Sequence, residues 1–142
     1  MRGKLPSILM TVFALLGAAV PAFAHHAFGV EFDANKCMDL KGTLTGILWE
    51  NPHAYFDMDV KNSDGTVVSW HPEMVTPNAL KRTGTTRQDF VDNIGKTINV
   101  RACVARFGGD SKGAASYLAL SDGLIRLVGQ EVERRRTEEK HF

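Results

Sequence analysis

Residues 53–71, H-A-Y-F-D-M-D-V-K-N-S-D-G-T-V-V-S-W-H, carry the clearest structural pattern in the chain. Apolar residues occupy every second position from Ala54 to Val60, which is typical of a strand with one buried face. The Asp64-Gly65 pair tolerates the positive φ angles of a tight antiparallel turn. This stretch therefore predicts a β-hairpin with strands at 53–60 and 66–71.

The segment before the hairpin predicts a bent first strand over residues 38–48, after an extended lead-in over 28–36. Met38, Leu40, Leu44 and Leu48 alternate along it. Gly42 and Gly46 fall on the same face, where glycines usually mark strong bending or a bulge. Asn51-Pro52 ends this strand, and a corner is expected again at Pro72-Glu73.

The segment after the hairpin begins with a short helix. Thr76 suits the N-cap, Pro77 the first helical position and Gly84 the left-handed stop. Thr86 and Asp89 resemble a capping box that opens one more turn. A strand with alternating apolar residues follows at 98–104, and a closing hairpin turns at residues 121–123.

This order of elements predicts an all-β domain with one short helix, an OB-like antiparallel barrel of five to six strands over residues 25–129. A β-sandwich with the same strands is the alternative. In the barrel, the first and fourth strands are neighbours. These strands carry Cys37 and Cys103, which are the two cysteines of the chain, so a disulfide between them is expected, with a thiolate metal site as the alternative.

The first 24 residues have the composition of a cleavable export signal. Arg2 and Lys4 precede an apolar run, and Ala22-Phe23-Ala24 offers small residues at the −3 and −1 positions of a cleavage site. Cleavage there would make His25 the amino terminus of a periplasmic protein. The apolar run is too short to span a bilayer comfortably, so no membrane span is expected after cleavage.

The charge balance argues against a nucleic-acid partner. The chain has 17 Lys and Arg against 16 Asp and Glu. Loss of Arg2 and Lys4 with the leader would leave a slight acidic excess, whereas nucleic-acid binding needs a basic surface. The tail, residues 130–142, is highly charged and lacks core periodicity, which predicts a frayed helix or a disordered tail.

Four histidines are candidate metal ligands: His25, His26, His53 and His71. An amino-terminal histidine can chelate one ion through its free amine and its imidazole together. With His26 and either His53 or His71, the donors become the nitrogen-rich set that Cu(II) prefers. The alternative is that these histidines only form hydrogen bonds at turns, and no other cofactor is indicated.

Three aromatic residues, Trp49, Tyr55 and Trp70, form a candidate ligand surface, because aromatics on strands two and three of OB barrels can bind ligands. The alternative is that they pack under neighbouring segments. For catalysis, no nucleophile lies in a Gly-x-Ser-x-Gly elbow. Asp57 and Asp59 share an outward strand face, which is more often a solvated surface than a catalytic pair.

The chain resembles an exported bacterial family of unknown function. Its characteristic pieces are a His-His-Ser-Phe mature start and a Trp-x-Asn-Pro-His motif, present here as His25-His26-Ala27-Phe28 and Trp49-Glu50-Asn51-Pro52-His53. The resemblance implies a small exported β-rich protein and supplies no reaction. The expected function is a non-enzymatic periplasmic module that binds a small ligand, a metal ion or another protein. Copper binding is the first alternative, and a hydrolase-type enzyme is the second.

Overall fold

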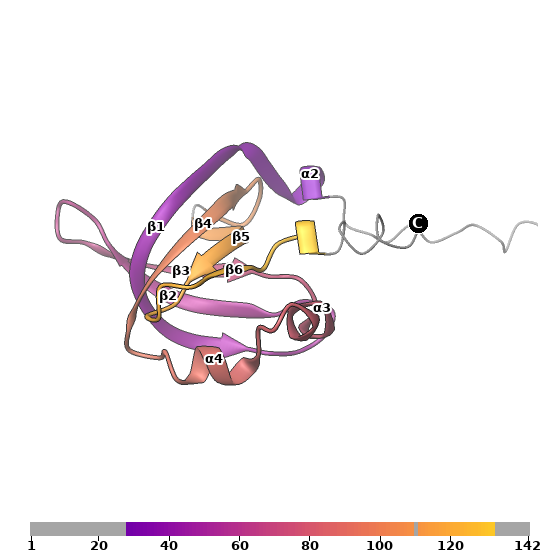
Figure 1. The fold of residues 1–142 in the computed structure, drawn as a ribbon. Coiled ribbons are helices and arrows are strands. Elements are labelled where there is room, and N and C mark those ends of the chain that lie inside the picture. Colours follow the sequence, from indigo (N-terminus) through magenta and orange to yellow (C-terminus); the bar gives the residue numbers. More distant parts are fainter. Residues whose placement is uncertain (1–27, 110, 133–142) are drawn as a thin grey trace, which may run out of the picture.

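A computed structural model of the protein describes residues 28–109 and 111–132 (Figure 1). The elements, in chain order, are α2 (Phe28–Glu31), β1 (Phe32–Leu48), β2 (Tyr55–Lys61), β3 (Val67–Glu73), α3 (Pro77–Arg82), α4 (Arg87–Val91), β4 (Thr97–Ala105), β5 (Lys112–Ala119) and β6 (Ile125–Leu127). None of the helices in these two ranges is long and apolar enough to cross a membrane. The predicted leader, and the tail beyond residue 132, lie outside the described residues.

The six strands form one sheet that closes into a barrel. Their order is β3-β2-β1-β4-β5-β6, and a parallel pairing between β3 and β5 joins the two sides of the sheet. Figure 1 shows the long β1 arching around the other strands. The predicted OB-like barrel is confirmed, including the pairing of the first and fourth strands.

The predicted central hairpin is confirmed. β2 and β3 pair antiparallel, and Gly65 takes a φ of 89° in the turn. The predicted corner at Pro72-Glu73 is wrong, because β3 continues through both residues. Pro72 pairs in parallel with Gly113 of β5, and this pairing keeps the end of β3 extended. Proline is compatible with an extended backbone.

β1 is longer than predicted and begins at Phe32, directly after the short helix α2, where an extended lead-in was expected. Its pairing with β2 shifts register between Leu44 and Gly46, which confirms the predicted bulge. The bulge reverses the alternation of the strand. Ile47 consequently packs against the core, whereas Leu48, expected on the inward face, is exposed.

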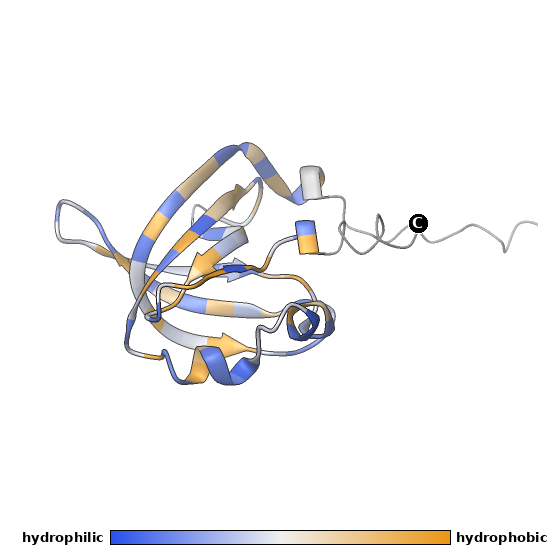
Figure 2. Cartoon of the chain, in the orientation of Figure 1, coloured by the Kyte–Doolittle hydropathy of each residue, from blue (hydrophilic) through white to orange (hydrophobic). Residues whose placement is uncertain are grey.

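Hydrophobic and hydrophilic residues alternate along the strands, so one side of the sheet fills the barrel (Figure 2). The largest wholly buried side chains include Phe56, Met58 and Ile98, from β2 and β4, and Phe90, from α4. α3 and α4 add to this core at one end of the barrel. Their caps are as predicted, with Thr76 and a Thr86–Asp89 capping box.

Two details of the fold differ from the prediction. The described part of the chain has three short helices, because α2 was not expected and the predicted extra turn after Thr86 forms α4, beside the expected helix α3. At the other end, Val132 is only 9% exposed and belongs to the core. Packing therefore extends beyond residue 129, into the first residues of the segment predicted to be a disordered tail.

Candidate functional site

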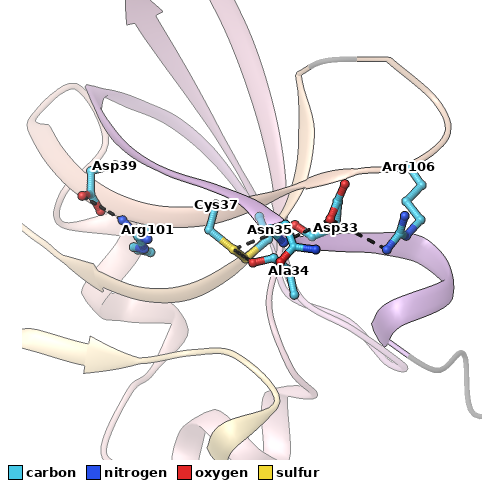
Figure 3. The surroundings of a disulfide bond; sticks show 8 residues. Asp33, Ala34, Asn35, Cys37, Asp39, Arg101 and Arg106 are labelled. Carbon is cyan, nitrogen blue, oxygen red and sulfur yellow. Dashed lines mark hydrogen bonds and ion pairs between the residues drawn. A yellow bond between two sulfur atoms is a disulfide. The ribbon is translucent and has the colours of Figure 1, made fainter.

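The predicted disulfide joins Cys37 of β1 to Cys103 of β4, and these two residues lie directly opposite each other in the pairing of the strands. Figure 3 shows the bridge with an ion pair on either side, Arg101–Asp39 at 3.0 Å and Arg106–Asp33 at 3.8 Å. Because both sulfurs are bonded to each other, the alternative of a thiolate metal site at these cysteines is wrong.

A polar cluster occupies the outer side of β2 and β3 at the end of the strands that faces α2. His71 of β3 lies 2.6 Å, Nδ1 to Oδ1, from Asp57 of β2. The ring of His71 also stacks on Tyr55, with centroids 5.0 Å apart and planes 4° from parallel. Alternate residues of a strand face the same side, so Tyr55 and Asp57 reach His71 together.

Glu73 connects this stack to the second strand-end histidine. One carboxylate oxygen, Oε2, accepts a hydrogen bond from the Tyr55 hydroxyl at 3.0 Å, and the other, Oε1, lies 2.9 Å from His53 Nδ1. Burial, followed by the charge and the hydrogen bond of Glu73, raises the pKa of Tyr55 to about 12. We refer to His53, Tyr55, Asp57, His71 and Glu73 as the β2–β3 cluster.

Both histidines of the β2–β3 cluster present the same nitrogen to a carboxylate. A carboxylate can only accept hydrogen bonds, so the proton of each neutral imidazole is on Nδ1. Within residues 28–109 and 111–132, Nε2 of His53 and Nε2 of His71 have no hydrogen-bond partner. Each Nε2 therefore keeps a lone pair that can accept a proton or bind a metal ion.

Two cavities adjoin the β2–β3 cluster. The α2-side cavity, of about 460 Å³, is lined by Glu31, Phe32, Tyr55, His71, Glu73, Ala105, Phe107, Lys112 and Gly113. The disulfide-side cavity, of about 290 Å³, contains His53 and both cysteines among its lining residues. Phe32 and Glu73 line both cavities. A ligand of the α2-side cavity would meet aromatic rings, carboxylates and one lysine.

The other predicted aromatic residues lie away from the cluster. Trp70 is inside the barrel and only 7% exposed. Trp49, expected on the outward side, follows the bulge in β1 and instead packs against Phe90, at 6.0 Å between ring centroids. Its buried Nε1 has no hydrogen-bond partner in the described part of the chain. Tyr55 is thus the member of the predicted aromatic surface that lines the α2-side cavity, whereas Trp70 lines a separate hollow beside Cys37 and Arg106.

Two of the four predicted metal ligands, His25 and His26, lie outside the described residues. His53 and His71 are near the same end of the barrel, as expected, but pair with different carboxylates. No group of three or more His, Cys, Asp or Glu side chains in the described ranges could hold a metal ion. A metal bound by His53 or His71 would therefore need further ligands from outside these ranges.

Several residues of this site carry only a weak signal in the sequence. Asp57 was expected to be a solvated strand residue, and Phe107 and Lys112 were not singled out. The sequence did not predict the contact of Asp57 with His71, because hydrogen bonding between β2 and β3 depends on strand register. Phe107, which is largely exposed, and Lys112 come from the β4–β5 connection and the start of β5.

The barrel, its inter-strand disulfide and the β2–β3 cluster define a small disulfide-bonded protein with an OB-like fold. The chain belongs to the family of unknown function DUF6152, whose model matches residues 14–115. The resemblance to an uncharacterised family is thereby confirmed. No curated protein and no solved structure matches the chain significantly.

Proposed function

We propose that this chain is an exported periplasmic protein that binds a small ligand without catalysing a reaction, and that the ligand occupies the α2-side cavity. The observation that carries this proposal is the stacked Tyr55–His71 pair on the wall of a cavity of about 460 Å³. This position, on the strand 2–3 face, is where OB folds commonly bind their ligands. The predicted export signal and the disulfide favour an oxidising compartment.

The cavity wall is held in place before any ligand arrives. The Tyr55 ring is fixed by the stack with His71 and by its hydroxyl bond to Glu73. The ring of His71 is in turn fixed by Asp57. A site that is already ordered loses less conformational entropy on binding, which favours recognition of a small molecule.

A fragment screen by NMR tests this proposal while the ligand itself is still unidentified. The probes are a library of small aromatic amines and aromatic carboxylates, added to the ¹⁵N-labelled protein. Amide shifts caused by binding should gather at Tyr55, His71, Phe107 and Lys112, and Tyr55→Ala should abolish them. The proposal fails if the shifts gather instead at a separate groove on β1, β4 and β5, whose lining includes Leu40, Arg101 and Tyr117, or if Tyr55→Ala leaves them unchanged.

Copper binding is the second candidate function. It is favoured by the position of α2, whose last residue, Glu31, lines the same cavity as His71. Only three residues, 25–27, separate a chain starting at His25 from Phe28. Three residues span at most about 10 Å, so a terminal amine at His25 would lie within that distance of Phe28.

The copper candidate is tested by comparing two forms of the exported protein, one starting at His25 and one with a single alanine before it. If the terminal amine chelates together with the imidazole, the added residue should weaken Cu(II) binding sharply, because it moves the amine away from His25. Equal and weak binding by the two forms would exclude the candidate. The amino-terminal residue of each form is checked by mass spectrometry.

A further inference from the structure

We infer that the ligand of the α2-side cavity is a small aromatic carboxylate, whose carboxylate group binds the Lys112 ammonium and whose ring contacts Phe107 and Tyr55. This inference rests on the proposed ligand-binding function, which leaves the chemical class of the ligand open. The charged and aromatic side chains that line the cavity, and the positions of these side chains along the sheet, support it.

Lys112 lies beside His71 where β5 and β3 pair. The two residues are partners in the parallel pairing of these strands, and both line the α2-side cavity. On its other side, His71 contacts Asp57 of β2. The Lys112 side chain also runs beside Gly108, since a Cβ atom on this glycine would lie 3.7 Å from Nζ. The ammonium group is therefore close to the residue that follows Phe107.

The charge of Lys112 has no partner within the described chain. In residues 28–109 and 111–132, no carboxylate lies within ion-pair distance of its ammonium group. Among the described side chains that line either the α2-side or the disulfide-side cavity, it is the one lysine or arginine. An ammonium group can only donate hydrogen bonds, so the group that it selects in a ligand is an acceptor, and an anion is the strongest.

Glu73, by contrast, already has donors of the fold at both oxygens. Oε2 accepts the Tyr55 hydroxyl at 3.0 Å, and Oε1 lies 2.9 Å from His53 Nδ1. A ligand amine that bound Glu73 would have to compete with these two contacts. The cavity therefore has a cation without a partner in the described chain, whereas its central carboxylate is satisfied.

The acidic and basic groups of the cavity also lie in different places. After burial and Glu73, the charge of Glu31 also raises the pKa of Tyr55, so both carboxylates act near its hydroxyl. Lys112 is instead paired with His71, two residues before Glu73 on β3, which corresponds to roughly 6.6 Å along the strand. A ligand anion at Lys112 is thus separated from the acidic end of the cavity.

The aromatic lining indicates the rest of the ligand. Phe107 is 78% exposed, so a bound molecule could cover its ring. Tyr55 is held in place by its stack with His71. Aromatic side chains favour contact with a further flat ring, in offset-stacked or edge-to-face geometry, and a cavity of about 460 Å³ suits a small molecule. A flat ring with a carboxylate would cover Phe107 and pair with Lys112 at the same time.

The test titrates the ¹⁵N-labelled exported protein with three probes that share one ring: benzoate, benzamide and benzylamine. At neutral pH these molecules are anionic, uncharged and cationic, and the amide shifts give a Kd for each. Lys112→Gln is compared with Lys41→Gln, which removes the same charge from a separate groove. Lys112→Arg keeps the charge, and circular dichroism melts verify that each variant folds.

We expect benzoate to bind most tightly and to shift the amides of Phe107 and Lys112. Lys112→Gln should raise the Kd of benzoate by about 10-fold, a value at the low end for a hydrogen bond to a charged group because this lysine is exposed. Lys41→Gln and Lys112→Arg should bind benzoate like the wild type. The Kd of benzamide should change less than that of benzoate when Lys112 is replaced by glutamine.

The inference is overturned if benzylamine binds more tightly than benzoate, or if Lys112→Gln has no larger effect than Lys41→Gln. This failure is distinguishable from failure of the proposed function. If benzylamine binds in the cavity and Tyr55→Ala abolishes its binding, the ligand-binding function stands and the anionic class is refuted. If neither these probes nor the fragment library shift the amides of the cavity, both proposals are refuted.

Discussion

Removal of the Cys37–Cys103 disulfide should destabilise the barrel strongly. The two cysteines are 66 residues apart in sequence, and the chain-entropy model assigns a closed loop of this length roughly 4 kcal/mol at 25 °C. For a domain of this size, an m value of about 1.5 kcal/mol/M converts that loss into a fall of ~3 M in the urea midpoint. The melting temperature should fall by about 15–30 °C.

The assay is urea unfolding followed by tryptophan fluorescence, for the wild type with and without a phosphine reductant and for the double variant Cys37→Ala/Cys103→Ala. The reductant should lower the wild-type midpoint to nearly that of the double variant and should not affect the double variant. A loss below about 1 kcal/mol in both comparisons would refute the reasoning. It would mean that the unfolded chain gains little freedom when the bridge is broken.

Three further perturbations test other parts of the structure. In a spectrophotometric titration, Tyr55 should ionise with a pKa of about 12, and Glu73→Gln should move that pKa toward the ordinary value of 10. The folded protein retains this proton to higher pH than the unfolded chain, so stability should decline as the pH rises from about 10 to 12. An ordinary Tyr55 pKa would contradict both the burial of its ring and its contact with Glu73. Gly42→Ala should lower the free energy of unfolding, measured in urea, by about 1–3 kcal/mol, because its methyl group would collide with the Asp59 carbonyl. An unchanged free energy would contradict the close approach of β1 and β2. Thr86→Ala should lower the free energy of unfolding by about 1 kcal/mol, because the capping box is lost. An unchanged melting temperature would show that α4 does not depend on its cap.

Much of the fold could be predicted because its determinants are local. The alternation from Ala54 to Val60, the Asp64-Gly65 turn and the caps of the two helices depend on neighbouring residues, and all were confirmed. The disulfide could also be predicted, since the barrel order places strands one and four side by side. The continuation of β3 through Pro72 was missed, because it results from pairing with β5.

The candidate site was predictable only in part. His71 and Tyr55 could be singled out by residue type, and both line the α2-side cavity. The roles of Asp57 and Glu73 depend on which residues face them across the strands. Trp49 was expected to face outward, and its burial follows from the bulge in β1. The glycines indicate a bulge in β1, but they do not show at which residue the alternation shifts.

The strands, their turns and the pairing of the cysteines could be inferred from the chain alone, because hydrophobic period and turn chemistry act over a few residues. Only the tertiary structure decided which face of the sheet each residue of β1 takes after the bulge. It also decided which carboxylate contacts each histidine. These features depend on the closure of the barrel and on strand register. A shift of one residue moves a side chain from the core to the surface.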